Sequence, residues 1–256
     1  MEIPFDPGAE AIHIRARLEE LAARPTWGPR KIHLRIATPN LRAIVRERST
    51  VLDAANDGDL AELADLLWSG VTYDEMSVAV EILRRRPALV TRDRIERWRG
   101  WLDQWGVTDE LASVVRQWLA ADPGERYGYV ESLAASDDVW TRRLGIASTV
   151  LLSREGRELD RTLALLDGTL GDRRRMIVNA VSWALREIAK SDPDKVQRYV
   201  EENHDRLPAR VRLEVWNKLR TGRKDGSPAK TIRTRLDRAR ARSGERRTRP
   251  RDRTKD

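Results

Sequence analysis

The chain has 256 residues, with 49 Lys and Arg against 41 Asp and Glu, 3 His and no Cys. That length suits one large domain or two small ones, and either can bury a core without covalent cross-links. The lack of Cys excludes disulfides, thiolate zinc sites, iron–sulfur clusters and cysteine nucleophiles. The few scattered His argue against a His-based metal site, so we predict neither a metal nor a cofactor.

Nothing in the sequence indicates a membrane or secreted protein. No apolar run approaches the ~20 residues that a membrane span needs. The opening residues, MEIPFDPGAE, contain neither the basic segment nor the apolar segment of a secretory signal. We therefore expect a cytoplasmic protein.

The positive charge is concentrated at the C-terminus. Residues 221–256 hold 14 Lys and Arg against 5 Asp and Glu, whereas residues 1–220 hold 35 against 36. We predict an Arg-rich tail over 226–256, largely disordered from about Gly244, because it contains too little apolar surface to offset the entropy of ordering. Two interpretations of the tail stay open: a non-specific phosphate-binding arm, or a solubilising terminus with no partner.

The rest of the chain, 1–225, shows the 3.6-residue apolar period of helices. Helix starts are marked by Thr-Pro and Asp-Pro pairs, and we interpret Gly70, Gly106, Gly168 and Gly222 as helix ends. The only β-like stretch is the short segment Lys31–Ile36. The predicted helices cover 9–23, 39–48, 58–69, 73–86, 91–103, 108–120, 124–134, 137–153, 158–167, 172–190, 193–203 and 208–220.

This succession of predicted helices and short turns predicts an all-α fold. About 12 helices with short turns suggest stacked helical hairpins of roughly 35–45 residues, as in a right-handed solenoid of HEAT-like repeats. No strict sequence repeat is visible, so a compact non-repeat bundle is the alternative.

Three of these helices carry residues on an unexpected face. In 172–190, Trp183 lies roughly 120–130° from the apolar stripe, beside Arg186 and Lys190. A Trp usually packs in a core, but an indole among cations also suits a contact platform with phosphate-binding groups beside it.

In 137–153, Arg143 lies at the edge of the apolar stripe. Such an Arg needs an anion or must extend to solvent. It is either a phosphate clamp, for which a guanidinium is well shaped, or one half of a structural ion pair with a neighbouring helix.

In 108–120, Asp109 points about 160° away from the core face. Taken alone, it is best interpreted as a solvated carboxylate favoured by the helix dipole. Trp105 lies four residues earlier, in the predicted turn at Gly106, and taken alone it is best interpreted as a core residue.

Taken in order, three segments resemble the AlkD-like DNA alkylation repair family, whose members are HEAT-like-repeat DNA glycosylases. The resemblance covers roughly residues 30–220. The segments are Trp105-Gly-Val-Thr-Asp109, Asp137-Asp-Val-Trp140-Thr-Arg-Arg143, and Ser182-Trp-Ala-Leu-Arg-Glu-Ile-Ala-Lys190 with the Asp-Pro helix start that follows it.

The resemblance implies that Trp105, Asp109 and Trp183 line the lesion site and that Arg143 holds a phosphate. The family excises positively charged N3- and N7-alkylated purines from double-stranded DNA without drawing the base into a pocket. We expect further DNA contacts from Arg186, from Lys190 and from the helix start at Thr38. The expected location is then the nucleoid, and the expected state is a monomer.

The implied chemistry needs few groups. A cationic alkylpurine leaves as a neutral base, so no general acid is required. One carboxylate facing the deoxyribose can stabilise the oxocarbenium-like sugar and orient a water molecule. No Lys is placed as a Schiff-base nucleophile, so we predict a monofunctional glycosylase of base excision repair.

Two alternatives to methyl-adduct repair stay open. The chain could be a non-catalytic scaffold that binds branched or damaged DNA, or it could excise bulky alkyl adducts. One departure from the family pattern concerns the segment before Thr38, where Arg35 stands at a position usually occupied by Gly. That departure bears on the contacts made to the lesion strand.

Overall fold

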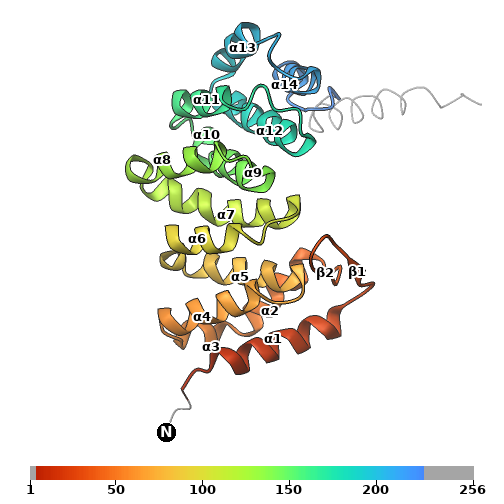
Figure 1. Cartoon of the computed structure of the whole chain (residues 1–256), viewed down its shortest axis with the longest axis vertical. Coiled ribbons are helices and arrows are strands. Elements are labelled where there is room, and N and C mark those ends of the chain that lie inside the picture. The colour runs from red at the N-terminus through yellow and green to blue at the C-terminus, as the bar shows by residue number, and fades with distance from the viewer. Residues whose placement is uncertain (1–3, 228–256) are drawn as a thin grey trace, which may run out of the picture.

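The computed structural model describes residues 4–227, so the predicted tail over 226–256 lies almost wholly outside the described residues. The described chain forms one stack of helices that climbs in chain order, with a small β-hairpin at its side (Figure 1). Its elements are α1 (Pro7–Leu21), β1 (Thr26–Trp27), β2 (Ile32–His33), α2 (Thr38–Glu47), α3 (Ser49–Ala54), α4 (Asp57–Trp68), α5 (Tyr73–Arg85), the 3₁₀ turn η1 (Pro87–Leu89), α6 (Arg92–Arg99), α7 (Trp105–Ala121), α8 (Pro123–Ala134), α9 (Val139–Ser148), α10 (Val150–Arg154), α11 (Leu159–Asp167), α12 (Arg175–Ser191), α13 (Pro193–Glu202) and α14 (Ala209–Thr221).

The helices form two layers, which confirms the predicted solenoid. In one layer α2, α5, α7, α9, α12 and α14 each pack on the next, and we call this the inner layer. Helices α1, α4, α8 and α13 pack on it from the other side. Each element thus contacts mainly its sequence neighbours, as in repeat proteins. Within residues 4–227, no helix is both long enough and apolar enough to cross a bilayer.

The inner-layer helices from α5 to α14 run in the same direction. Side chains in the first half of one helix contact side chains in the first half of the next: Ser77 of α5 donates to Glu110 of α7 at 2.5 Å, and Ser182, at the middle of α12, donates to Glu214 of α14 at 2.7 Å. The N-terminal turns of successive inner helices therefore lie side by side along one edge of the stack.

The structure corrects the predicted helix boundaries in several places, among them the end of α6 at Arg99 and the start of α12 at Arg175. The short helix α3 was not predicted, and the predicted helix 137–153 divides at Thr149 into α9 and α10. The division coincides with hydroxyl groups that bind carbonyls of the preceding turn, Ser148 to Leu144 and Thr149 to Ile146, an arrangement that bends helices.

Another correction concerns Gly106, which lies in the first turn of α7 rather than in a turn between helices. Both the amide and the hydroxyl of Thr108 bond to the carbonyl of Gln104, at 3.3 and 2.8 Å. These bonds extend the helix back to Trp105, three residues earlier than predicted.

The β-like segment forms half of an antiparallel hairpin that is fixed to the helices. Thr26 pairs with His33 and Trp27 with Ile32. The buried Lys31 ammonium donates to the carbonyls of Trp68 and Gly70 at the C-terminal end of α4. A cation is favoured at that end of a helix dipole, so Lys31 anchors the hairpin to the stack.

Helices α8 and α9 approach each other closely at Gly145. A Cβ atom on Gly145 would lie 2.4 Å from the backbone nitrogen of Ala134. Because backbone cannot yield as a flexible side chain can, this contact fixes the separation of the two helices.

We therefore expect Gly145→Ala to lower the free energy of unfolding by about 1–3 kcal/mol, the usual cost of overpacking. Gly128→Ala is the matched control, because Gly128 lies inside α8 with open space around it. The control should raise stability by about 0.5–1 kcal/mol through helix propensity. Chemical denaturation measures both, and equal effects of the two variants would contradict the close approach.

Candidate active site

The candidate site is built around one ion pair between inner helices. Asp109 lies in the second turn of α7, and Arg143 lies at the corresponding level of α9. Arg143 Nε donates to Oδ1 of Asp109 at 2.9 Å, and Arg143 Nη2 donates to Oδ2 at 2.7 Å. The Arg143 side chain is 7% exposed and the Asp109 side chain 25% exposed. The pair is therefore a two-point guanidinium–carboxylate contact that is open to solvent on its aspartate side.

Arg143 also links the pair to a third helix. Its Nη1 donates to the carbonyl oxygen of Met176, in the first turn of α12, at 2.7 Å. The structure thus shows the ion pair that sequence left as one of two interpretations for Arg143. These contacts use three of the five guanidinium N–H groups, which leaves two for a phosphate.

The pair has a clear electrostatic consequence. A two-point contact with a guanidinium fixes the orientation of the carboxylate. Because Arg143 offsets the charge of Asp109, a phosphodiester can approach without facing a lone carboxylate. Each Asp109 oxygen accepts one of these two bonds, and lone pairs remain for a water molecule or a sugar.

Trp105 is exposed, not buried, so the alternative that it packs in the core is wrong. It is the first residue of α7, one helical turn before Asp109, and 60% of its surface is accessible. The earlier helix start explains the difference, because it places the indole at the free end of the helix on the same face as Asp109.

Trp183 lies further along α12. It is partly buried and packs against the core. Seven residues separate it from Met176, which corresponds to about 10 Å along the helix axis. Asp109 and Arg143 are in direct contact, and Trp183 is connected to them through α12.

Arg186 and Lys190 are both occupied by carboxylates. Arg186 Nη1 donates to Glu214 of α14 at 2.6 Å, and burial lowers the pKa of its guanidinium. Lys190 Nζ lies 2.6 Å from Glu187, one turn earlier on α12. These partners reduce the charge that either residue can offer to DNA.

Thr38 lies where sequence placed it, as the first residue of α2. It is exposed, and the preceding Ala37 provides no side-chain cap for the helix. The end of α2 is therefore open to an anion.

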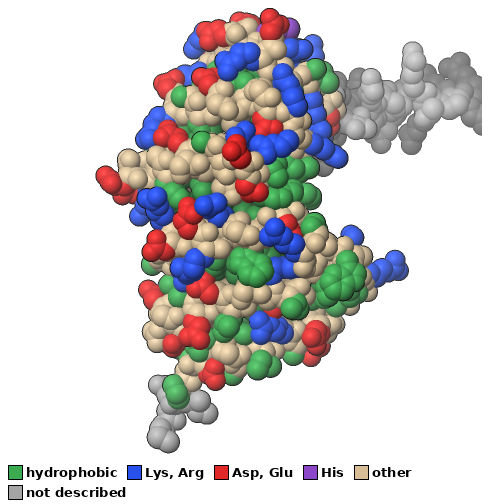
Figure 2. All heavy atoms as spheres, in the orientation of Figure 1, with side chains coloured by type: hydrophobic (Ala, Val, Ile, Leu, Met, Phe, Trp, Pro, Cys, Tyr) green, Lys and Arg blue, Asp and Glu red, His purple; other side chains and the backbone are tan. Residues whose placement is uncertain are grey.

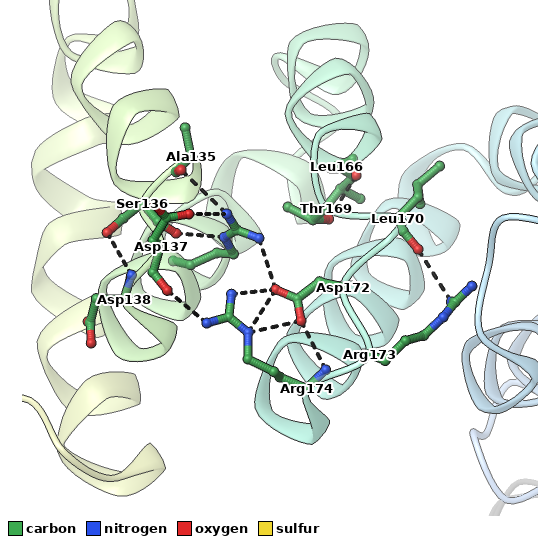
Figure 3. Close-up of polar contacts among 11 residues, drawn as sticks. Ala135, Ser136, Asp137, Asp138, Leu166, Thr169, Leu170, Asp172, Arg173 and Arg174 are labelled. Carbon is green, nitrogen blue, oxygen red and sulfur yellow. Dashed lines mark hydrogen bonds and ion pairs between the residues drawn. The ribbon is translucent and has the colours of Figure 1, made fainter.

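Ion pairs fix the spacing between α9 and α12 at their N-terminal ends (Figure 3). Asp172 accepts from Arg142 at 2.9 Å and from Arg174 at 2.6 Å, and hydrogen bonds from Arg174 lead in lowering the pKa of this carboxyl. Arg174 also donates to the carbonyl of Asp137. This network holds together the loops that precede α9 and α12, the helices that carry Arg143 and Met176.

The hairpin carries an exposed surface that sequence reasoning missed. Trp27 is 82% exposed, the highest value among the large apolar residues of 4–227. Its signal in the sequence is the Gly-Pro pair that follows it, which is typical of a tight turn. In Figure 1 the hairpin projects from the side of the stack below the N-terminal end of α7, and Figure 2 shows a hollow in the surface at that level.

No enclosed pocket adjoins the pair among the cavities found in the described chain. One cavity of about 350 Å³ involves Arg142 and Leu165, and another of about 280 Å³ involves Val114 and Trp118. Neither is lined by Asp109. The candidate site is an open surface.

Comparison with protein families gives one decisive match. The model of a family described as DNA alkylation repair enzyme matches residues 32–219. The chain belongs to this DNA alkylation repair family. The match confirms the resemblance drawn from the three sequence segments and spans the helices that carry the ion pair.

Solved structures agree with this DNA alkylation repair fold. The chain superposes with a TM-score of 0.64 on a protein from Enterococcus faecalis described as a predicted DNA alkylation repair enzyme, at 13% identity over 85% of this chain and 98% of that one. It superposes on AlkD2 from Streptococcus mutans with a TM-score of 0.58, at 16% identity over 81% and 95%. A third match, smu.31 from Streptococcus mutans UA159, has a TM-score of 0.57 at 15% identity over 82% and 96%. At these identities the likeness concerns the fold. A search of curated proteins found no match.

The backbone at Arg35 accounts for the expectation of Gly at this position. Arg35 has a φ of 63°, in the left-handed region that favours Gly. Its side chain is exposed and donates to the hydroxyl of Thr26 at 3.1 Å. The hairpin thus keeps the conformation of the glycine while adding a cation.

We expect Arg35→Gly to be more stable than Arg35→Ala by about 1 kcal/mol, because Gly adopts the left-handed conformation without steric cost. Both variants remove the same hydrogen bond, so their difference isolates the backbone term. Thermal unfolding measures it. If the two variants melt at the same temperature, the left-handed conformation is not the reason for glycine at this position.

Proposed function

We propose that this DNA alkylation repair protein is a monofunctional glycosylase that hydrolyses the N-glycosidic bond of positively charged N3- or N7-alkylated purines in double-stranded DNA. The observation that carries the proposal is the Asp109–Arg143 pair, which presents an oriented, solvent-accessible carboxylate beside the exposed Trp105. The family and fold supply the context of DNA repair.

The geometry suits a reaction without acid catalysis of base departure. An alkylated purine already carries a positive charge and leaves as a neutral base. The barrier then lies in forming a cationic sugar, which a fixed carboxylate stabilises electrostatically. The same carboxylate can accept a hydrogen bond from the attacking water.

Trp105 is proposed to contact the cationic sugar and base through its indole face. Aromatic faces attract cations by about 0.5–2 kcal/mol, depending on desolvation. Because Trp105 is exposed at the free end of α7, it can reach a lesion that stays in the helix stack. An open surface suits this mode better than extraction of the base into a pocket.

The remaining predicted contacts are assigned to the DNA backbone. Arg143 would donate its two unused N–H groups to a phosphate, and the open end of α2 at Thr38 would bind another. Trp183 would line the same face from α12. Arg186 and Lys190 would contribute to the field of the inner layer while remaining bound to their carboxylates.

A DNA-binding scaffold without chemistry is the competing function. Such a scaffold has no need of a carboxylate held accessible beside an exposed indole. Tight binding to undamaged branched DNA, together with no base release from alkylated duplexes, would establish the scaffold and overturn the glycosylase.

The first test removes the charge of the carboxylate. Asp109→Asn should lower single-turnover release of 7-methylguanine or 3-methyladenine from alkylated duplex DNA about a hundredfold or more, the usual effect of losing one electrostatic group. Asp160→Asn is the matched control. Asp160 lies on α11, is exposed, and within residues 4–227 forms an ion pair only with Lys195 of α13, away from the candidate site. Equal release by wild type and Asp109→Asn would remove Asp109 from the mechanism.

The second test asks whether Arg143 acts through Asp109. Arg143→Gln should slow excision by itself, because Asp109 loses its orientation. In the Asp109→Asn background it should add little, since residues that act as a unit are strongly non-additive. Fully additive losses in the double variant would show that the two residues work separately.

A further inference from the structure

Three arginines from helices α5, α7 and α10 influence one another electrostatically beyond the candidate site. They are Arg84 of α5, Arg116 of α7 and Arg154 of α10. Both Arg84 and Arg154 act electrostatically on Arg116, and both disfavour its charge. Like charges that influence one another in this way repel, so each of the three is expected to have an anionic partner.

Two of the three do have partners. Arg84 is paired with Glu81, one turn earlier on α5. Arg154 Nε donates to Glu187 at 2.7 Å, and Glu187 also accepts from Lys190. The charges of Arg84 and Arg154 are therefore compensated within the protein.

Arg116 is the exception. It is half-buried, yet its guanidinium makes no hydrogen bond or ion pair to any residue within 4–227. Burial is the main cause that lowers the pKa of Arg116, and repulsion from Arg154 and Arg84 adds to it. The carboxylates of Asp109 and Glu187 favour its charge, but neither makes a hydrogen bond or ion pair to it. Since Arg stays protonated in proteins, Arg116 is a partly buried charge without a directly bound anion.

The position of Arg116 relates it to the candidate site. Asp109 and Arg116 are seven residues apart on α7, so they point within about 20° of each other on the same helix face. The axial separation is about 10 Å at 1.5 Å per residue. Duplex DNA advances about 3.4 Å per nucleotide of a strand, so that separation corresponds to about three nucleotides.

We propose that Arg116 binds a backbone phosphate of the DNA within about three nucleotides of the lesion, and that this phosphate is the anion missing from the arginine group. The inference rests on the proposed function for the location of the lesion at Asp109. A guanidinium is well suited to the ligand because its donors match two oxygens of a phosphodiester. The phosphate would also relieve the repulsion from Arg84 and Arg154.

This role makes an unusual prediction about stability without DNA. Arg116→Gln should not lower the unfolding temperature, because it removes a partly buried charge that no residue of 4–227 pairs with directly and that burial disfavours. A clear fall would show that Arg116 supports the fold through a partner of its own, and would overturn the proposal. Arg97→Gln, on α6, serves as the control for an arginine that is paired with a carboxylate.

The decisive experiment replaces single phosphates by neutral methylphosphonates. The duplex carries a tetrahydrofuran abasic analogue, which cannot be excised, and each phosphate up to three nucleotides from the analogue is replaced in turn on either strand. For the wild type, one replacement should weaken binding about tenfold, as expected for one charge-assisted hydrogen bond. For Arg116→Gln, the same replacement should have no effect, while Arg97→Gln should behave as the wild type.

The outcomes separate this inference from the proposed function. Loss of the phosphate effect in Arg116→Gln alone supports the contact, whether or not the protein releases alkylated bases. A phosphate effect of equal size in both proteins, or no sensitive phosphate in this range, overturns it. Base release without a phosphate effect would leave the glycosylase standing and refute only the role of Arg116.

Discussion

The contact on which the site depends is the three-way link made by one guanidinium. Arg143 of α9 holds both oxygens of Asp109 on α7 and the carbonyl of Met176 on α12. A guanidinium can do this because its donors lie in one rigid plane and point in fixed directions. The orientation of the carboxylate is therefore determined by three helices together.

The solenoid makes this link possible. Successive inner helices run parallel, so residues at the same level of neighbouring helices face one another. Ion pairs around Asp172 then fix the distance between the loops that precede α9 and α12. A compact bundle with antiparallel neighbours would not bring these three N-terminal segments to one edge.

Periodicity and caps predicted the fold and nearly every helix, because those signals are local. They did not predict the exposure of Trp105, since it depends on where α7 begins, and a shift of three residues turns a loop residue into an exposed helix end. Helical angles placed Asp109 and Arg143 off the core, but their pairing depends on how α7 and α9 pack. The partner of Lys190 was within reach of sequence, because Glu187 stands three residues before it. The partner of Arg186 could not be predicted in this way, because Glu214 lies on another helix, α14.

Arg143 and its two partners lie on three consecutive inner helices, with Asp109 34 residues before Arg143 and Met176 33 residues after it. Any change in superhelical pitch must stretch one of these links before the helices themselves separate. The hydrogen bonds of the Arg143 side chain therefore depend on the curvature of the central repeats. Bending of the outer repeats leaves these hydrogen bonds in place, whereas bending of the central repeats changes the orientation of the Asp109 carboxylate.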